Sequence, residues 1–146
     1  MGVTTRLHAN YNDLGSGFPL LYRSVMTRGF VQESRIGAVR RAIDAAGHPA
    51  LYMVDTISSL ASIDYRHDEW GVDVTVAGSQ KGLMLPPGLS FNAVSEKARK
   101  ASQGAKLPRS YWNWEEIIAN NKNGYFPYTP ATNLLYGLRE SLAMLM

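Results

Sequence analysis

A lysine that follows an apolar run and stands between glycines constrains this chain more than any other feature. Residues 72 to 77 have the composition of a buried strand, and directly after them come Gly78-Ser79-Gln80-Lys81-Gly82 and then Pro86-Pro87-Gly88. On a tight turn at the end of a buried strand, a lysine is expected to lie against apolar walls, where desolvation disfavours the ammonium and leaves a neutral amine free to form an imine. Lys81 is therefore the first candidate for a reactive group.

A carboxylate ends the preceding apolar run, where residues 50 to 54 are followed by Asp55. At the carboxyl end of a parallel strand, such a side chain points into the crevice where open α/β sheets bind ligands. Pyridoxal-phosphate enzymes need both groups, a lysine that holds the aldehyde and an acid that keeps the pyridine nitrogen protonated. Taken singly, Lys81 reads more readily as a solvated turn lysine and Asp55 as a cap or turn acid.

Several motifs in order resemble the class V aminotransferases of the fold-type I pyridoxal-phosphate family, most closely the serine–glyoxylate and alanine–glyoxylate group. Besides the two motifs above, they are Val54-Asp55-Thr56-Ile57-Ser58-Ser59-Leu60, Tyr128-Thr129-Pro130 and Leu135-Tyr136-Gly137-Leu138-Arg139-Glu140-Ser141-Leu142. The resemblance covers about residues 34 to 146. It implies an α/β fold, a three-layer α/β/α arrangement with a mainly parallel sheet, as part of the large domain of such an enzyme.

The resemblance also implies the chemistry. Pyridoxal 5'-phosphate would be the cofactor, and serine or alanine would pass its amino group to glyoxylate. Lys81 would be the catalytic residue, because it both holds the cofactor and moves the proton between substrate Cα and cofactor C4′. Asp55 would stabilise the pyridinium.

Three further residues match cofactor-binding positions of the family. The resemblance places Ile57 on one face of the pyridine ring and the Gln80 amide near the phosphate. It also implies that Thr129 contacts the phosphate of the neighbouring subunit's cofactor, and therefore that the protein is a homodimer. In some relatives a tyrosine also contacts this phosphate, and Phe126 stands at that position here. Without the resemblance, Ile57 is a core residue, Gln80 fills a turn and Thr129 caps a helix.

The chain has 146 residues, and members of the resembled family are more than twice as long. We therefore expect a partial cofactor-binding domain over residues 34–146, preceded by a poorly matched segment over residues 1–33, where Thr27 to Phe30 stand near the family's phosphate-gripping motif. The alternative is a non-catalytic truncated protein, or at most a dimerisation fragment.

Composition excludes several other classes. The chain has no cysteine, which rules out disulfides and thiolate zinc ligands and, together with Gln80, argues against a cysteine desulfurase. The three histidines lack the spacing of metal ligands, and the net charge of +3 is dispersed enough to argue against nucleic acid as a partner. No apolar run has the length of a membrane span and the first residues lack a signal-peptide core, so we expect a cytoplasmic protein.

Apolar periodicity predicts alternating helices and strands. Helices are expected over 35 to 46, from Ser95 and Glu96 to about 102, near 115 to 119, and from a cap at Thr129 to the end of the chain. Strands are expected over 18 to 22, 50 to 54, 73 to 77 and 89 to 94. This alternation is typical of a parallel sheet with helices packed on it.

Overall fold

The computed structural model describes residues 8–9, 20–24 and 33–146. The segment over residues 1–33 that we expected to match poorly lies mostly outside these ranges, and Thr27 to Phe30 lie wholly outside them. A strand does form at Leu20–Ser24, overlapping the one predicted over 18 to 22.

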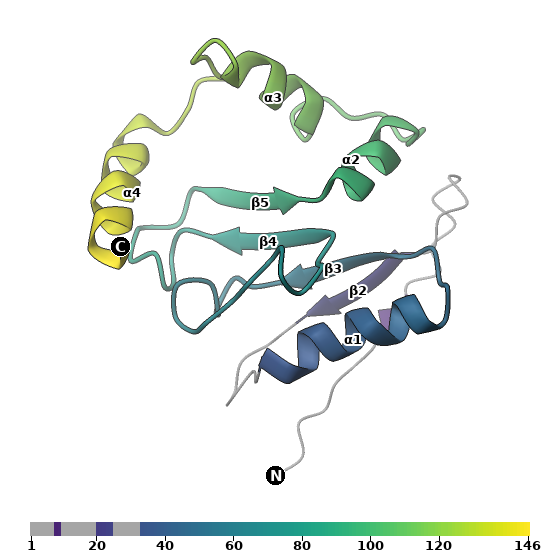
Figure 1. Ribbon diagram of the computed structural model, residues 1–146. Coiled ribbons are helices and arrows are strands. Elements are labelled where there is room, and N and C mark those ends of the chain that lie inside the picture. The colour runs from purple at the N-terminus through teal and green to yellow at the C-terminus, as the bar shows by residue number, and fades with distance from the viewer. Residues whose placement is uncertain (1–7, 10–19, 25–32) are drawn as a thin grey trace.

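The described strands form one mixed sheet in the order β1-β2-β3-β4-β5 (Figure 1). Their bounds are β1 His8–Ala9, β2 Leu20–Ser24, β3 Leu51–Asp55, β4 Val74–Gly78 and β5 Ser90–Val94. Strands β2, β3 and β4 run parallel, whereas β1 pairs antiparallel with β2 and β5 antiparallel with β4. The parallel arrangement expected from the sequence therefore holds for the three central strands but not for the edges.

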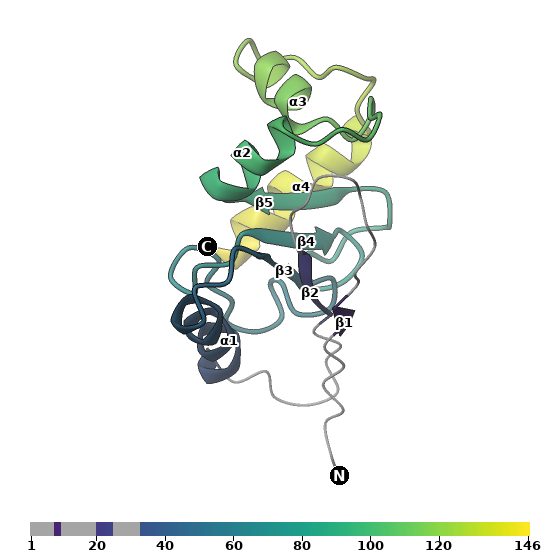
Figure 2. The ribbon, with the colours of Figure 1, turned by 90° about the vertical axis from the view of Figure 1, so that its right-hand side faces the viewer.

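In the part of the chain that the structure describes, four helices accompany the sheet, namely α1 Glu33–Ala45, α2 Glu96–Gln103, α3 Trp114–Asn121 and α4 Thr132–Leu145. Helix α1 connects the parallel strands β2 and β3 and lies on one face of the sheet. Figures 1 and 2 both place α2 and α3 beyond the β5 edge, away from α1. None of the helices in the described ranges has the length and apolar character needed to cross a membrane.

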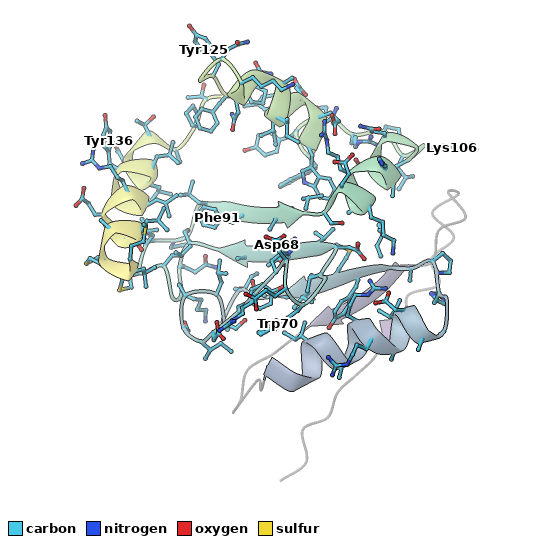
Figure 3. All side chains as sticks on the ribbon, in the orientation of Figure 1. Asp68, Trp70, Phe91, Lys106, Tyr125 and Tyr136 are labelled. Carbon is cyan, nitrogen blue, oxygen red and sulfur yellow. The ribbon has the colours of Figure 1, made fainter. Side chains whose placement is uncertain are left out.

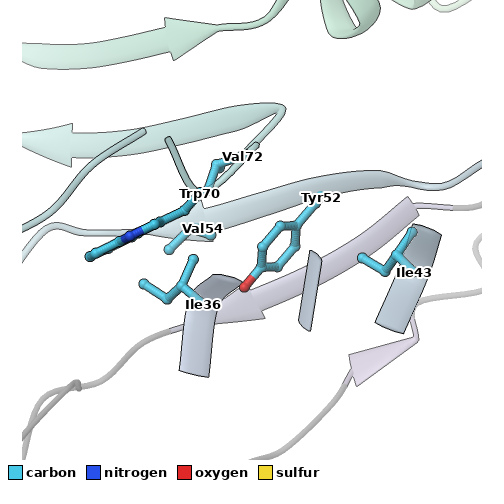
Figure 4. Packing of buried hydrophobic residues seen from close by; sticks show 6 residues of the cluster. All are labelled: Ile36, Ile43, Tyr52, Val54, Trp70 and Val72. Carbon is cyan, nitrogen blue, oxygen red and sulfur yellow. The ribbon is translucent and has the colours of Figure 1, made fainter. Parts of the chain in front are cut away.

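The core lies between α1 and β3 (Figure 4). Tyr52 and Val54 alternate with more exposed residues along β3, so both point to the α1 side, where they meet Ile36 and Ile43. Trp70 closes the cluster and packs edge-on against Tyr65, with ring centroids 5.4 Å apart. The period of two in β3 and the helical period in α1 thus specify the same interface.

The predicted helix boundaries hold where local polar groups cap the backbone. Helix α1 ends at Ala45, and Gly47 follows with a φ of +57° while the His48 amide donates to the Ile43 carbonyl. Ser95 caps α2 through a hydrogen bond from the Ala98 amide, as predicted. Asn113 caps α3 in the same way for the Glu115 amide.

The predicted start of α4 is wrong. The helix begins at Thr132 after Ala131, and Ala131 contributes no side-chain cap. A turn in which the Pro130 carbonyl accepts from the Thr132 amide comes before the helix, and the Leu135 amide donates to the Ala131 carbonyl, so the helical hydrogen bonds start two residues after Thr129. The exposed Thr129 side chain therefore does not cap α4.

Candidate active site

Asp55 is the last residue of β3, where the strand passes into a series of turns. Its Oδ1 accepts a hydrogen bond of 3.0 Å from the Ile57 amide, two residues further on. This local turn, in which an aspartate side chain holds its own backbone, orients the carboxylate. Ile57 is half-buried beside it.

The end of β3 is fastened to β4 by Thr56, which is fully buried. Its amide and its hydroxyl both donate to the carbonyl of Val76, over 2.8 and 3.0 Å. Asp55 itself stands in register with Val76. Since adjacent strands are about 4.8 Å apart, this places Asp55 beside the strand that leads to Lys81.

Lys81 lies on the connection between β4 and the antiparallel β5, three residues after β4 ends. The prediction that Asp55 ends a strand adjacent to the one before Lys81 is confirmed by the parallel pairing of β3 with β4. The expectation of apolar walls around the lysine is wrong, because the side chain is exposed. A long charged side chain on a turn stays in water unless another segment covers it, and the described residues leave it uncovered.

Gln80 is exposed next to Lys81, and its amide folds back over Gly78. A Cβ added to Gly78 would lie 2.8 Å from Gln80 Oε1, so the missing side chain at Gly78 makes room for the glutamine. The Gln80 donors therefore stay at the carboxyl end of β4. Thr129 is exposed in the loop before α4.

Three contacts that the sequence analysis missed hold the segment around Lys81 in place. Ser79 is fully buried, and its hydroxyl joins both ends of the connection between β4 and β5. Ser141 of α4, also buried, donates to the carbonyl of Leu83 over 2.6 Å. A Cβ on Gly82 would lie 2.2 Å from the carbonyl oxygen of Leu60, so the Lys81 segment touches the turns that follow Asp55.

Small residues carried the signal that would have found these contacts. Ser79 and Gly82 flank the candidate lysine, and Ser141 lies among the leucines of the last predicted helix. A serine that cannot reach water must pair its hydroxyl inside the protein, so its position next to a buried strand predicts a bridging role.

The groups at this edge of the sheet have the chemistry that pyridoxal phosphate requires. An acid oriented by its own turn and a primary amine follow two neighbouring parallel strands, and amide donors stand beside the amine. Within the part of the chain that the structure describes, no three histidine or acidic side chains cluster closely enough to hold a metal ion. The carboxylate and the amine are groups that suit an organic cofactor with an aldehyde and a basic ring nitrogen.

Comparison with known sequences gives several relatives that are named as glyoxylate aminotransferases. The chain is 58% identical over 117 residues to a serine–glyoxylate aminotransferase of Methylorubrum extorquens. It is 50% identical over 109 residues to an L-aspartate–glyoxylate aminotransferase of Paracoccus denitrificans and 46% identical over 111 residues to a serine–glyoxylate aminotransferase of Arabidopsis thaliana. No family model matches the chain.

These alignments cover 75 to 77% of this chain but only 28 to 29% of the relatives. The chain therefore spans less than a third of the length of the curated relatives it matches.

Solved structures agree with the sequence relatives. An aspartate aminotransferase of Thermus thermophilus superposes with a TM-score of 0.64 at 34% identity, over 75% of this chain and 30% of that one. A pyridoxamine–pyruvate aminotransferase of Mesorhizobium loti gives a TM-score of 0.62 at 30% identity, over 76% of this chain and 29% of that one. The sheet and helices described above are thus shared with aminotransferases over most of the described chain.

Proposed function

The chain is a partial-length member of the glyoxylate aminotransferases, with the fold of part of a fold-type I enzyme, and we propose on this premise that it carries the lysine and aspartate of a pyridoxal-phosphate site for transamination to glyoxylate. The parallel pairing of β3 with β4 is the observation that carries the proposal, because it brings Asp55 and the Lys81 segment to one edge of the sheet. Serine is the first amino donor to test, since relatives named for it share up to 58% of aligned residues.

Each residue has a task that its position supports. When bound, pyridoxal phosphate supplies an electron sink for charge at the substrate Cα. Asp55, held by the Ile57 amide, would keep a proton on the pyridine nitrogen by its negative charge. The Lys81 amine would hold the cofactor aldehyde and would serve as general base and acid at the substrate Cα. Ile57 would support the ring, and Gln80 would donate to the phosphate.

The exposure of Lys81 bears on activity. Both imine chemistry and general-base catalysis need a neutral amine in an enclosed site, and the described residues do not enclose Lys81. We expect the 146-residue chain to bind cofactor weakly and to show little or no transamination alone, because its catalytic groups are not shielded from water.

Exposed apolar side chains on the α3 and α4 side support a homodimer as the working assembly. Trp112, Tyr125 and Tyr136 are 75, 70 and 63% exposed, and Figure 3 shows Tyr125 and Tyr136 projecting away from the sheet. Soluble monomers seldom expose many large apolar groups together. We propose that a second copy covers part of this surface and that the loop with Thr129 then reaches the partner's cofactor phosphate.

A non-catalytic dimerisation partner is the second candidate, and the exposure of both Lys81 and this apolar surface favours it. Such a protein would keep the association but would not react with the aldehyde at Lys81. The two candidates thus differ in where cofactor becomes attached.

Reductive trapping of the cofactor tests the proposal. The purified chain is incubated with pyridoxal phosphate, reduced with borohydride and mapped by peptide mass spectrometry. We expect modification at Lys81 ahead of Lys97, Lys100, Lys106 and Lys122, loss of that signal in Lys81→Ala, and no change at Lys81 in the control Lys122→Ala. Modification of the other lysines with none at Lys81 would refute the assignment.

Turnover and assembly are measured on the same preparation. Serine and glyoxylate with excess cofactor should give little product, and sedimentation velocity reports whether a dimer forms. Robust turnover that disappears in Lys81→Ala would contradict the expectation that the chain lacks a complete site.

A further inference from the structure

We propose that Ser79 is the positioning residue for Lys81, because it closes the base of the loop that carries the lysine. The inference deepens the proposed function and rests on it. The loop runs from residue 79 to residue 89, between β4 and β5, and Lys81 stands near its start.

Ser79 makes four hydrogen bonds that cross this loop. Its hydroxyl donates to the Pro86 carbonyl over 2.7 Å and accepts from the Leu89 amide over 3.2 Å. Its amide donates to the Leu89 carbonyl over 3.1 Å, and its carbonyl accepts from the Leu85 amide over 3.1 Å. The side chain is 0% exposed, so water cannot replace these partners.

The loop requires such a fastening because its backbone is not relaxed. Met84 takes a φ of +58°, a left-handed conformation that a residue with a side chain adopts only when its surroundings impose it. The Met84 amide donates to the Lys81 carbonyl over 2.8 Å, so the turn that contains Lys81 is the strained part. Without closure at Ser79, this turn can relax and carry the lysine with it.

A second buried serine on the same loop provides a matched comparison. Ser141 fixes the far side of the loop through the Leu83 carbonyl, but it does not link the two ends. Ser79 and Ser141 are both buried and each loses one hydroxyl when changed to alanine. A general loss of stability would affect the two variants alike, whereas loss of closure affects Ser79→Ala alone.

The experiment compares Ser79→Ala, Ser79→Thr and Ser141→Ala with the unsubstituted 146-residue chain. The first readout is the rate of borohydride-trapped modification at Lys81 by pyridoxal phosphate, divided by the rate at Lys122 in the same molecule. The second is hydrogen exchange at the Leu89 amide, which donates a hydrogen bond to Ser79 Oγ. The Tyr52 amide of β3 is the reference.

In Ser79→Ala we expect the Lys81 to Lys122 ratio to fall about tenfold or more, because displacement of a reacting group by about 1 Å costs up to about a hundredfold in rate. Leu89 exchange should accelerate while Tyr52 exchange stays unchanged. Ser141→Ala should keep the ratio within about threefold of the original, well short of the misplacement effect. Ser79→Thr keeps the hydroxyl and should restore most of the ratio.

An unchanged ratio in Ser79→Ala, or an equal fall in Ser141→Ala, would overturn the positioning role. If the Tyr52 amide of Ser79→Ala also loses its protection from exchange, the fold itself is disturbed and Ser79→Thr becomes the deciding variant. A Lys81 to Lys122 ratio that stays low in Ser79→Thr would then overturn the proposal. If the unsubstituted chain is never modified at Lys81, the proposed function fails, while the exchange at Leu89 still shows whether Ser79 closes the loop.

Discussion

Removal of the Asp73 carboxylate should destabilise the chain more than any other single change at the amino-terminal edge of β4. Asp73 is 4% exposed and stands directly before β4, at the opposite end of the strand from Lys81. Its Oδ2 accepts from the Tyr52 amide over 2.8 Å and from Arg40 Nη1 over 3.3 Å, and its Oδ1 accepts from the Ser95 hydroxyl over 3.0 Å. One carboxylate therefore joins α1, β3 and the cap of α2.

The expected magnitudes follow from what each substitution leaves unpaired. Asp73→Ala removes the acceptor for all these donors and takes from Arg40, whose side chain is 15% exposed, its buried partner. Breaking a buried pair costs about 3–5 kcal/mol when the remaining charge is uncompensated, and because Arg40 keeps its ion pair with Asp44, we expect a loss near the lower end of that range. Asp73→Asn retains an oxygen for the Tyr52 amide and can donate to Ser95, but it loses the charge. Hydrogen bonds to charged groups contribute about 1.5–3 kcal/mol, so Asp73→Asn should cost no more than about that amount.

Loss of the ion pair with Lys97 adds little to the destabilisation expected for either variant. Its Nζ lies 3.6 Å from Asp73 Oδ2, but its side chain is 47% exposed, and an ion pair that open to solvent contributes about 0–1 kcal/mol. Lys97 also donates to the Ala50 carbonyl over 2.8 Å, a contact that survives when the carboxylate is removed.

Urea unfolding followed by ellipticity at 222 nm measures these differences. Asp68→Asn is the matched control, because Asp68 is exposed and a surface change of this kind shifts stability by no more than about 0.5 kcal/mol. A small domain has only about 5–15 kcal/mol of stability, so the alanine variant should be visibly weakened. If Asp73→Ala unfolds within about 1 kcal/mol of the Asp68→Asn control, the carboxylate is not the link described here.

Two pH effects follow from groups outside the candidate site. Burial raises the pKa of Tyr65 from 10.0 to about 12, so stability that is complete below pH 10.0 should decline as pH rises toward 12, and less so in Tyr65→Phe. Ultraviolet difference spectra measure this ionisation, and ionisation of Tyr65 together with the exposed tyrosines would contradict it. Two hydrogen bonds from Arg99 lower the pKa of Glu115 below its ordinary 4.5, so the link between α2 and α3 should persist above that range and weaken as pH falls through the lowered pKa. Carboxyl NMR titration should show the pKa of Glu115 returning toward 4.5 in Arg99→Gln, and an unchanged value there would exclude the arginine as the cause.

The strands and helices were predictable because side-chain period and local caps agree along most of the described chain. The alternation at Tyr52 and Val54 and the helical spacing of Ile36 and Ile43 specify opposite sides of one interface. The order of the two apolar runs then sufficed to predict that Asp55 ends a strand beside β4. Ser95 shows the same agreement at a helix start.

The direction of β5 was not predicted, although a signal was present. Alternating residues specify a strand without specifying which way it runs, and the sequence analysis assumed a mainly parallel sheet. The connection over residues 79 to 89 is shorter than the dozen or more residues that a parallel crossover needs. Its length alone therefore favoured the antiparallel pairing that the structure has.

The surroundings of Lys81 could not be predicted from its neighbours in sequence. Burial depends on which segments lie over the side chain, and the apolar residues on either side of the loop carry no information about that.

Asp73 is a different case. A carboxylate within an apolar run must be paired when the strand is buried, so its role could have been inferred, but its partners come from α1 and α2 and required the fold.

Position and environment at the candidate site therefore have separate origins. The positions of Asp55 and Lys81 depend on contacts within this chain, since Thr56 fastens one strand end to β4 and Ser79 closes the loop that follows it. The described residues leave Lys81 exposed, so any cover over this side chain would have to come from outside them, for example from a second copy of the chain. We therefore expect cofactor capture at Lys81 to be easier to detect in this chain than transamination, because capture needs only the amine and its position, whereas turnover needs an enclosed site. Transamination as readily detected as trapped cofactor at Lys81 would contradict this expectation.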